Sequence, residues 1–139
     1  MHAAIEPSTR QAIEALIYEH AWLIDHGQAD RLPGLYTEDA RVLGIGPDKV
    51  GQQAITEWAG QRAAMTERCS RHVQSNIRLE AVSPDLIRGT VVLTLYRHDG
   101  AGRGEPVPLV IGGYADLYER CPDGAWRFAE RRLSTAFGS

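Results

Sequence analysis

The sequence has few of the features that disulfide-rich, nucleic-acid-binding or membrane proteins need. Its 139 residues include two cysteines, Cys69 and Cys121, which form neither a disulfide framework nor a zinc-binding pattern. A net charge of −3 leaves no basic footprint for nucleic acid. No apolar run approaches the ~20 residues that a membrane-spanning helix requires. With no recognisable signal peptide either, we expect a cytoplasmic protein without nucleic-acid or membrane partners.

Motifs for metal, nucleotide or covalent acyl chemistry are also missing. No two histidines stand four residues apart, and His20, Asp25 and His26 do not share one helix face. The glycines between residues 100 and 104 lie in an expected hairpin loop, with no helix after them to bind a phosphate. No nucleophile elbow is present. We therefore expect neither a metal ion nor another cofactor.

The apolar pattern predicts helices in the first half of the chain and strands in the second. A first helix begins near a capping box of Ser8 and Gln11 and ends at Asp25, just before Gly27. The other expected elements are a short helix at 30–36, a short strand at 40–45, a helix at 51–65, and four long strands at 71–82, 86–98, 107–120 and 125–136. Turn-forming residues between the long strands indicate an antiparallel meander.

This order of elements predicts a single α+β domain spanning residues 1–139. The expected strands are longer than usual, which suggests a strongly curved antiparallel sheet. N-terminal helices packed on such a sheet would close a cone with a pocket inside. A small-molecule substrate is the expected occupant of that pocket.

Asp25 is the most informative single residue, because a carboxylate that closes an apolar helix is costly unless another group answers its charge. His72, at the start of a later strand, is the best candidate partner. An Asp–His pair would form a general acid/base site that needs no cofactor. Simple alternation places His72 with Gln74 on the solvent face, opposite Val73, whereas a bulge or a polar inner wall would turn it inward. The alternative is that Asp25 and His72 both lie in solvent and do not form a pair.

Four short phrases resemble the SnoaL-like branch of the NTF2-like superfamily. They are Leu23-Ile24-Asp25, Leu35 to Ala40, Arg71 to Asn76 and Gly124 to Phe128. The resemblance spans residues 13–137 and implies that family's cone-shaped, cystatin-like fold. It is nearest to scytalone dehydratase and hexachlorocyclohexane dehydrochlorinase, whose aspartate and histidine positions fall on Asp25 and His72. It implies that His72 is the base, that Asp25 orients its imidazole, and that the chain forms a homodimer or homotrimer.

Four further residues are candidates for substrate binding. Tyr18 and Trp22 share a helix side with Asp25, and core or interface packing is the alternative for both. Tyr96 takes the place of a second pocket histidine of scytalone dehydratase and could donate a hydrogen bond to a substrate oxygen. His20 is either part of the cavity wall or a satisfied core histidine.

These features favour a cofactor-independent acid/base enzyme, a dehydratase-like lyase or an isomerase, acting on a small apolar cyclic substrate. Gly113 and Ala115 fall where scytalone dehydratase has a serine and an asparagine, which implies a roomier and less polar pocket. Two alternatives stay open. One is a polyketide-type cyclase or epoxide hydrolase, and the other is a non-catalytic binding or assembly module such as the β subunit of aromatic-ring dioxygenases.

Overall fold

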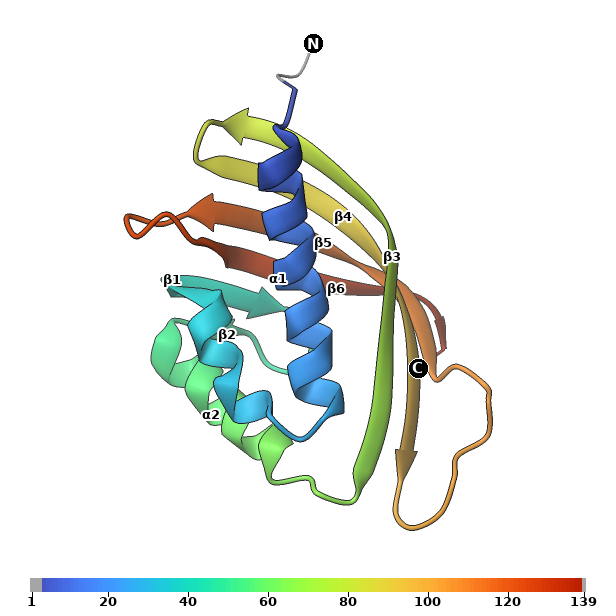
Figure 1. Cartoon of the computed structure of the whole chain (residues 1–139). Coiled ribbons are helices and arrows are strands. Elements are labelled where there is room, and N and C mark those ends of the chain that lie inside the picture. The colour runs from blue at the N-terminus through green and yellow to red at the C-terminus, as the bar shows by residue number, and fades with distance from the viewer. Residues whose placement is uncertain (1–3, 139) are drawn as a thin grey trace.

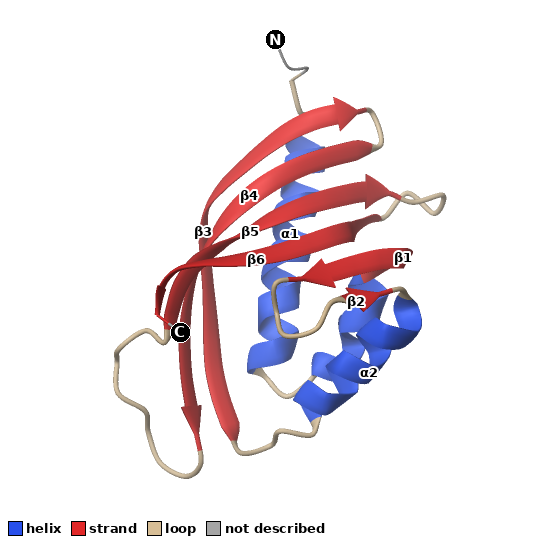
Figure 2. Ribbon diagram, turned by 180° about the vertical axis from the view of Figure 1, so that it is seen from behind, coloured by secondary structure: helices blue, strands red, loops and turns tan. Residues whose placement is uncertain are grey.

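The computed structural model describes residues 4–138. Its elements, in chain order, are α1 (Pro7–Asp25), the 3₁₀ helix η1 (Ala29–Leu35), β1 (Tyr36–Leu43), β2 (Lys49–Val50), α2 (Gln52–Ala63), β3 (Arg68–Ser83), β4 (Leu86–Asp99), β5 (Val110–Arg120) and β6 (Trp126–Gly138). Figure 1 shows all helices on one face of a curved sheet, and Figure 2 shows the opposite face without helices. The α+β class and the curved sheet packed against helices are confirmed.

The sheet is mixed rather than wholly antiparallel. Its strand order is β2-β1-β6-β5-β4-β3, and the four long strands form the expected antiparallel meander. The exception is β1, which pairs in parallel with β6. This pairing is possible because α2 and the long strands intervene between β1 and β6, and parallel neighbours need such a long connection. Within residues 4–138, no helix is long and apolar enough to cross a membrane.

The first helix begins and ends by different means. Its start does not use the expected capping box: Glu6 is the N-cap and makes no side-chain cap hydrogen bond, while Pro7 supplies a helical φ at the first position. Its end agrees with the sequence, because Gly27 adopts a φ of 74° and Gln28 N–H donates to the Leu23 carbonyl at 2.8 Å. That bond closes a Schellman-type end and leaves Asp25 as the last helical residue.

The core forms where α1 packs on the inner face of the sheet. Ile13 and Ile17, one turn apart on α1, are fully buried with Val91, Tyr118 and Phe128 from three strands. A second, smaller cluster joins the end of α1 to η1 and α2. The two clusters fix the C-terminal end of α1 against the sheet.

A bulge in β3 reverses the orientation of its side chains. The pairing of β3 with β4 shifts between Ser75 and Arg78, and Asn76 has a φ of 52°. Before the bulge, Gln74 is buried with the even-numbered residues, whereas after it Ile77 packs against the core. An extra residue in one strand has this effect because side chains otherwise alternate strictly. The inner face therefore holds His72.

A substitution at the bulge tests this explanation. Asn76→Val should lower the free energy of unfolding by about 1–2 kcal/mol more than Asn76→Gly does, because a β-branched residue is strained at positive φ. Urea denaturation followed by circular dichroism measures both. Ser75→Val, in extended backbone, is the matched control and should cost less than Asn76→Val. Equal stability of Asn76→Val and Asn76→Gly would contradict the bulge.

Candidate active site

Asp25 and His72 meet where the end of α1 reaches β3. Asp25 Oδ1 lies 2.7 Å from His72 Nδ1, and the other carboxylate oxygen accepts the His72 backbone N–H at 2.8 Å. Ser70 donates its hydroxyl to Asp25 Oδ1 at 2.8 Å. The side chains of Asp25 and His72 are only 6% and 13% exposed. The structure therefore brings the carboxylate of Asp25 and the imidazole of His72 into direct contact.

The environment of Asp25 keeps its carboxyl group ionised. Burial by itself would raise the pKa of Asp25, but the hydrogen bonds from the side chain and backbone of His72 and from Ser70 outweigh it and lower that pKa. A carboxylate only accepts hydrogen bonds, so His72 Nδ1 carries the proton between them. The other ring nitrogen, Nε2, is then the basic atom.

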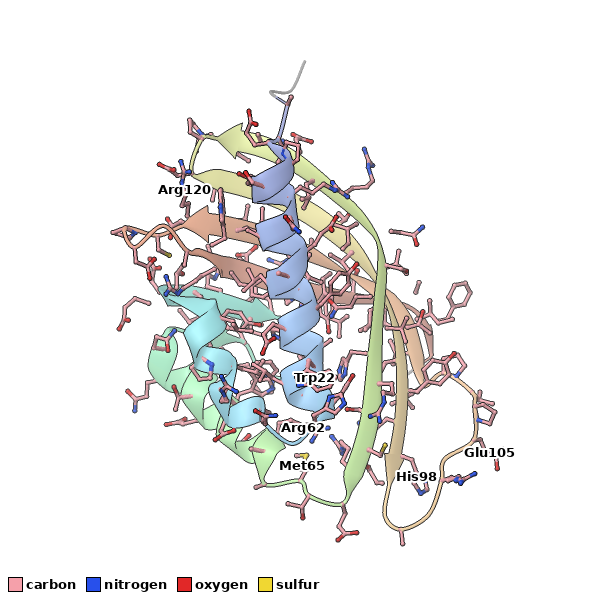
Figure 3. All side chains as sticks on the ribbon, in the orientation of Figure 1. Trp22, Arg62, Met65, His98, Glu105 and Arg120 are labelled. Carbon is pink, nitrogen blue, oxygen red and sulfur yellow. The ribbon has the colours of Figure 1, made fainter. Side chains whose placement is uncertain are left out.

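His72 lines a cavity of about 220 Å³ between the helix ends and the sheet. Trp58 and Met65 from the α2 side and Leu93 and Leu133 from the sheet give it apolar walls. Arg62 and Met65 lie at the end of α2, beside the end of α1 (Figure 3). A larger hollow of about 760 Å³ is lined by no histidine or cysteine of the part of the chain that the structure describes. The smaller cavity is therefore the one with a chemically useful wall.

Arg131 is the second functional group in this wall, and sequence reasoning missed it. Its side chain is 1% exposed and donates from Nε to Asp116 Oδ1 at 3.0 Å and from Nη2 to Gln74 Oε1 at 2.7 Å. Its guanidinium lies 3.6 Å from the ring centre of Tyr114. Nη1 is buried without a hydrogen-bond partner among the described residues. Such an N–H is costly to leave unpaired, which makes this atom a candidate hydrogen-bond donor to a bound molecule.

The Arg131–Asp116 pair is buried, and burial and pairing act on the carboxyl group in opposite directions. Burial raises the pKa of Asp116, while Arg131 and the hydroxyl of Tyr118, 2.7 Å away, oppose that shift. The guanidinium keeps its charge because arginine is not deprotonated in proteins. Asp116 could have been found from sequence, since it stands between Tyr114 and Tyr118 at inward strand positions. Such a carboxylate requires a cationic partner.

His20 also lines the cavity, but as a neutral residue. Its Nε2 lies 2.7 Å from the hydroxyl of Tyr36, and the ring makes edge contacts with Tyr36 and Phe128. Burial, with further contributions from the charges of Arg131 and His72, holds the pKa of His20 well below 6.5. Burial also raises the pKa of Tyr36, so Tyr36 is the donor in this bond. His20 thus combines both sequence interpretations, as cavity wall and satisfied core residue.

The structure does not bring Tyr18, Trp22 or Tyr96 to the cavity. Tyr18 and Trp22 are 50% and 54% exposed, because the buried stripe of α1 faces away from them, and Trp22 stacks on His26. Tyr96 stands between two strand residues that line the cavity, Leu95 and Arg97, and is not among its lining residues. Within residues 4–138, no group of three His, Cys, Asp or Glu side chains could hold a metal ion.

Comparison with known proteins agrees with this architecture. Residues 6–132 match the SnoaL-like domain model, so the chain belongs to the SnoaL-like family. No curated protein matches it.

Three solved structures show the same fold. The first is a protein from Novosphingobium aromaticivorans, provisionally named a scytalone dehydratase, with 23% identity, a TM-score of 0.80, and coverage of 92% of this chain and 84% of that one. LinA, a hexachlorocyclohexane dehydrochlorinase, has 26% identity, a TM-score of 0.76, and coverage of 94% and 87%. An NTF2-like protein with a cystatin-like fold, also from N. aromaticivorans, has 22% identity, a TM-score of 0.77, and coverage of 94% and 83%. The predicted family resemblance is confirmed.

The hydrogen bond from Ser70 generates a prediction about Asp25. Ser70→Ala should raise the pKa of Asp25 relative to the unsubstituted protein, because a donor to the charged form is lost. Carboxyl ¹³C NMR measures this pKa, which should lie below 3.8 in the unsubstituted protein. Ser134→Ala, at an exposed position on β6, is the matched control and should leave it unchanged. A pKa at or above 3.8 in the unsubstituted protein would contradict the hydrogen-bonding scheme.

The buried ion pair generates a prediction about stability. Arg131→Met should lower the free energy of unfolding by about 3–5 kcal/mol, because Asp116 is left as an unpaired buried charge. The double variant Arg131→Met/Asp116→Asn should recover most of that loss. Arg127→Met is the control on the same strand as Arg131. It breaks a solvent-exposed pair with Asp123 and should cost much less stability than Arg131→Met. Chemical denaturation measures all three, and a double variant no more stable than Arg131→Met would contradict the assignment.

Proposed function

We propose that this protein is a cofactor-independent acid/base lyase of the dehydratase type that acts on a small cyclic substrate. The observation that carries the proposal is the buried Asp25–His72 contact of 2.7 Å, which reaches a cavity through His72. A binding module has no need of an ionised carboxylate held against a histidine in a cavity wall. SnoaL-like relatives that include a dehydrochlorinase make elimination chemistry a reasonable expectation.

The proposed reaction is removal of a proton and a leaving group from neighbouring carbons. His72 Nε2 takes the proton from the carbon next to a substrate carbonyl, and the C–H electrons begin the new double bond. Asp25 stabilises the imidazolium that forms. Arg131 Nη1 donates to the carbonyl oxygen, where negative charge accumulates. When the leaving group is a hydroxyl, the imidazolium returns the proton to it, water departs and His72 becomes neutral again.

The same groups also support a second reaction, which is isomerisation. If the imidazolium returns its proton to a different carbon of the same intermediate, the double bond moves and nothing leaves. The low exposure of the His72 side chain favours both reactions, because it slows loss of the proton to bulk water between the two steps.

Matched histidine substitutions test the proposal. In D₂O with 3-hydroxycyclohexanone, ¹H NMR follows deuterium uptake beside the carbonyl and loss of water to cyclohexenone. His72→Gln and Asp25→Asn should each slow these steps by roughly 10²–10⁴-fold. His26→Gln, which changes an exposed histidine outside the cavity, should have no effect.

A second measurement does not depend on the substrate. ¹⁵N NMR of the imidazole should show the proton on His72 Nδ1, and Asp25→Asn should weaken that preference, because a neutral amide no longer requires a donor there. Equal rates for His72→Gln and the unsubstituted protein, or a proton on Nε2, would contradict the proposed role of His72.

A further inference from the structure

The cavity wall carries positive charge, although the chain as a whole carries a net negative charge. Four arginines line it, Arg62, Arg68, Arg97 and Arg131, and no carboxylate does. The whole chain has 18 acidic and 15 basic residues. Of the acidic residues near the cavity, Asp99 and Asp116 pair with these arginines and Asp25 pairs with His72. A wall of this kind presents hydrogen-bond donors and positive charge to whatever enters.

The arginines at the mouth are only partly neutralised. Arg68 binds Asp99 through two bonds, Nε to Oδ1 at 2.8 Å and Nη2 to Oδ2 at 3.2 Å. Arg97 lies 3.4 Å from the same Asp99 carboxylate, so one negative charge serves two guanidinium groups. Arg62 is half-buried and its only hydrogen bond among the described residues goes to the neutral hydroxyl of Ser70, at 3.0 Å. Burial and the neighbouring charge of Arg68 lower the pKa of Arg62, and the charges of Asp25 and Asp99 oppose that shift without reversing it.

The balance of charge limits what the cavity can hold. The four arginines face three carboxylates near the site, Asp25, Asp99 and Asp116, which leaves one positive charge in excess. The C-terminal ends of α1 and α2 add partial negative charge at the same place, of about half a unit per helix. Because these partial charges offset that excess, it is the guanidinium donors of the wall rather than a net positive charge that favour a single negative charge on the ligand, and a second one is disfavoured.

We propose that the substrate is a monoanion, a small cyclic or aromatic carboxylate whose carboxylate lies at the mouth against Arg62 and Arg97. Guanidinium groups suit this partner because their planar donors match a carboxylate. The apolar walls at Trp58 and Leu93 accept the ring, and a volume of about 220 Å³ limits it to roughly one ring. Placement of the reacting carbon at His72 rests on the proposed function, whereas recognition of the carboxylate does not.

Binding of a charged and a neutral probe of the same shape tests the proposal. By isothermal titration calorimetry at low salt, benzoate should bind about 10-fold or more tightly than benzamide. This preference should shrink at high ionic strength, because charges at the mouth are screened. Phenyl phosphate, with its second negative charge, should bind more weakly than benzoate.

Arginine variants locate the recognition. Arg62→Gln and Arg97→Gln should each weaken benzoate binding by about 10-fold and change benzamide binding by less than about 2-fold. Arg97 is the more exposed of the two, so its variant keeps the test valid if Arg62→Gln folds poorly. Arg120→Gln is the matched control: Arg120 lies at the far end of the sheet from Arg62 and should not affect either probe (Figure 3).

The outcomes separate this inference from the proposed function. Benzamide binding as tightly as benzoate, a preference that salt does not change, tighter binding of phenyl phosphate, or equal losses for both probes in the arginine variants would overturn the carboxylate assignment. None of these results depends on turnover. His72→Gln should retain benzoate binding within a few-fold while turnover is lost. The proposed role of His72 as a base can therefore be wrong while carboxylate recognition is right, and carboxylate recognition can be wrong while the role of His72 is right.

Discussion

The arrangement of the site depends on one carboxylate at the end of a helix. The two oxygens of Asp25 receive three donors from β3: the Ser70 hydroxyl, the His72 backbone N–H and the His72 imidazole. The same contact docks α1 on the sheet and fixes the ring of His72. Because these bonds stabilise the charged form, they outweigh the burial that opposes it. Docking and chemistry at this point are therefore a single interaction.

Much of the fold could be predicted because local patterns encode it. The helical stripe that ends at Gly27 and the turns between the long strands each have a direct physical cause in the sequence. The parallel pairing of β1 with β6 has no such local signal, since it joins segments far apart in the chain. The 3₁₀ form of η1, with Pro33 inside it, depends likewise on packing around it.

The site was predictable to a smaller extent, because bulges decide which way its side chains point. Asp25 and His72 were identified as partners, but alternation alone turned His72 outward, and the Asn76 bulge resolves the contradiction. A second register shift, opposite Leu117 and Tyr118, makes Arg131 rather than Glu130 an inward residue of β6. A sequence pattern does not show where an extra strand residue falls. The inward orientation of Arg131 was therefore not predicted, for the same reason that alternation placed His72 on the solvent face.

The buried Arg131–Asp116 pair suggests why the protein keeps charge in its core. Replacing such a pair with apolar residues is often neutral or stabilising, so stability alone does not explain it. Asp116, Gln74 and the ring of Tyr114 together hold the guanidinium in one orientation, and that orientation leaves Nη1 without a hydrogen-bond partner within residues 4–138. Asp25, at the end of α1, holds the imidazole of His72 in one orientation in the same manner. Each of the two groups is therefore held by a carboxylate that is not among the cavity's lining residues, Asp116 for Arg131 and Asp25 for His72. In the proposed reaction, a ligand that enters the cavity would meet a donor and a base whose orientation is already set.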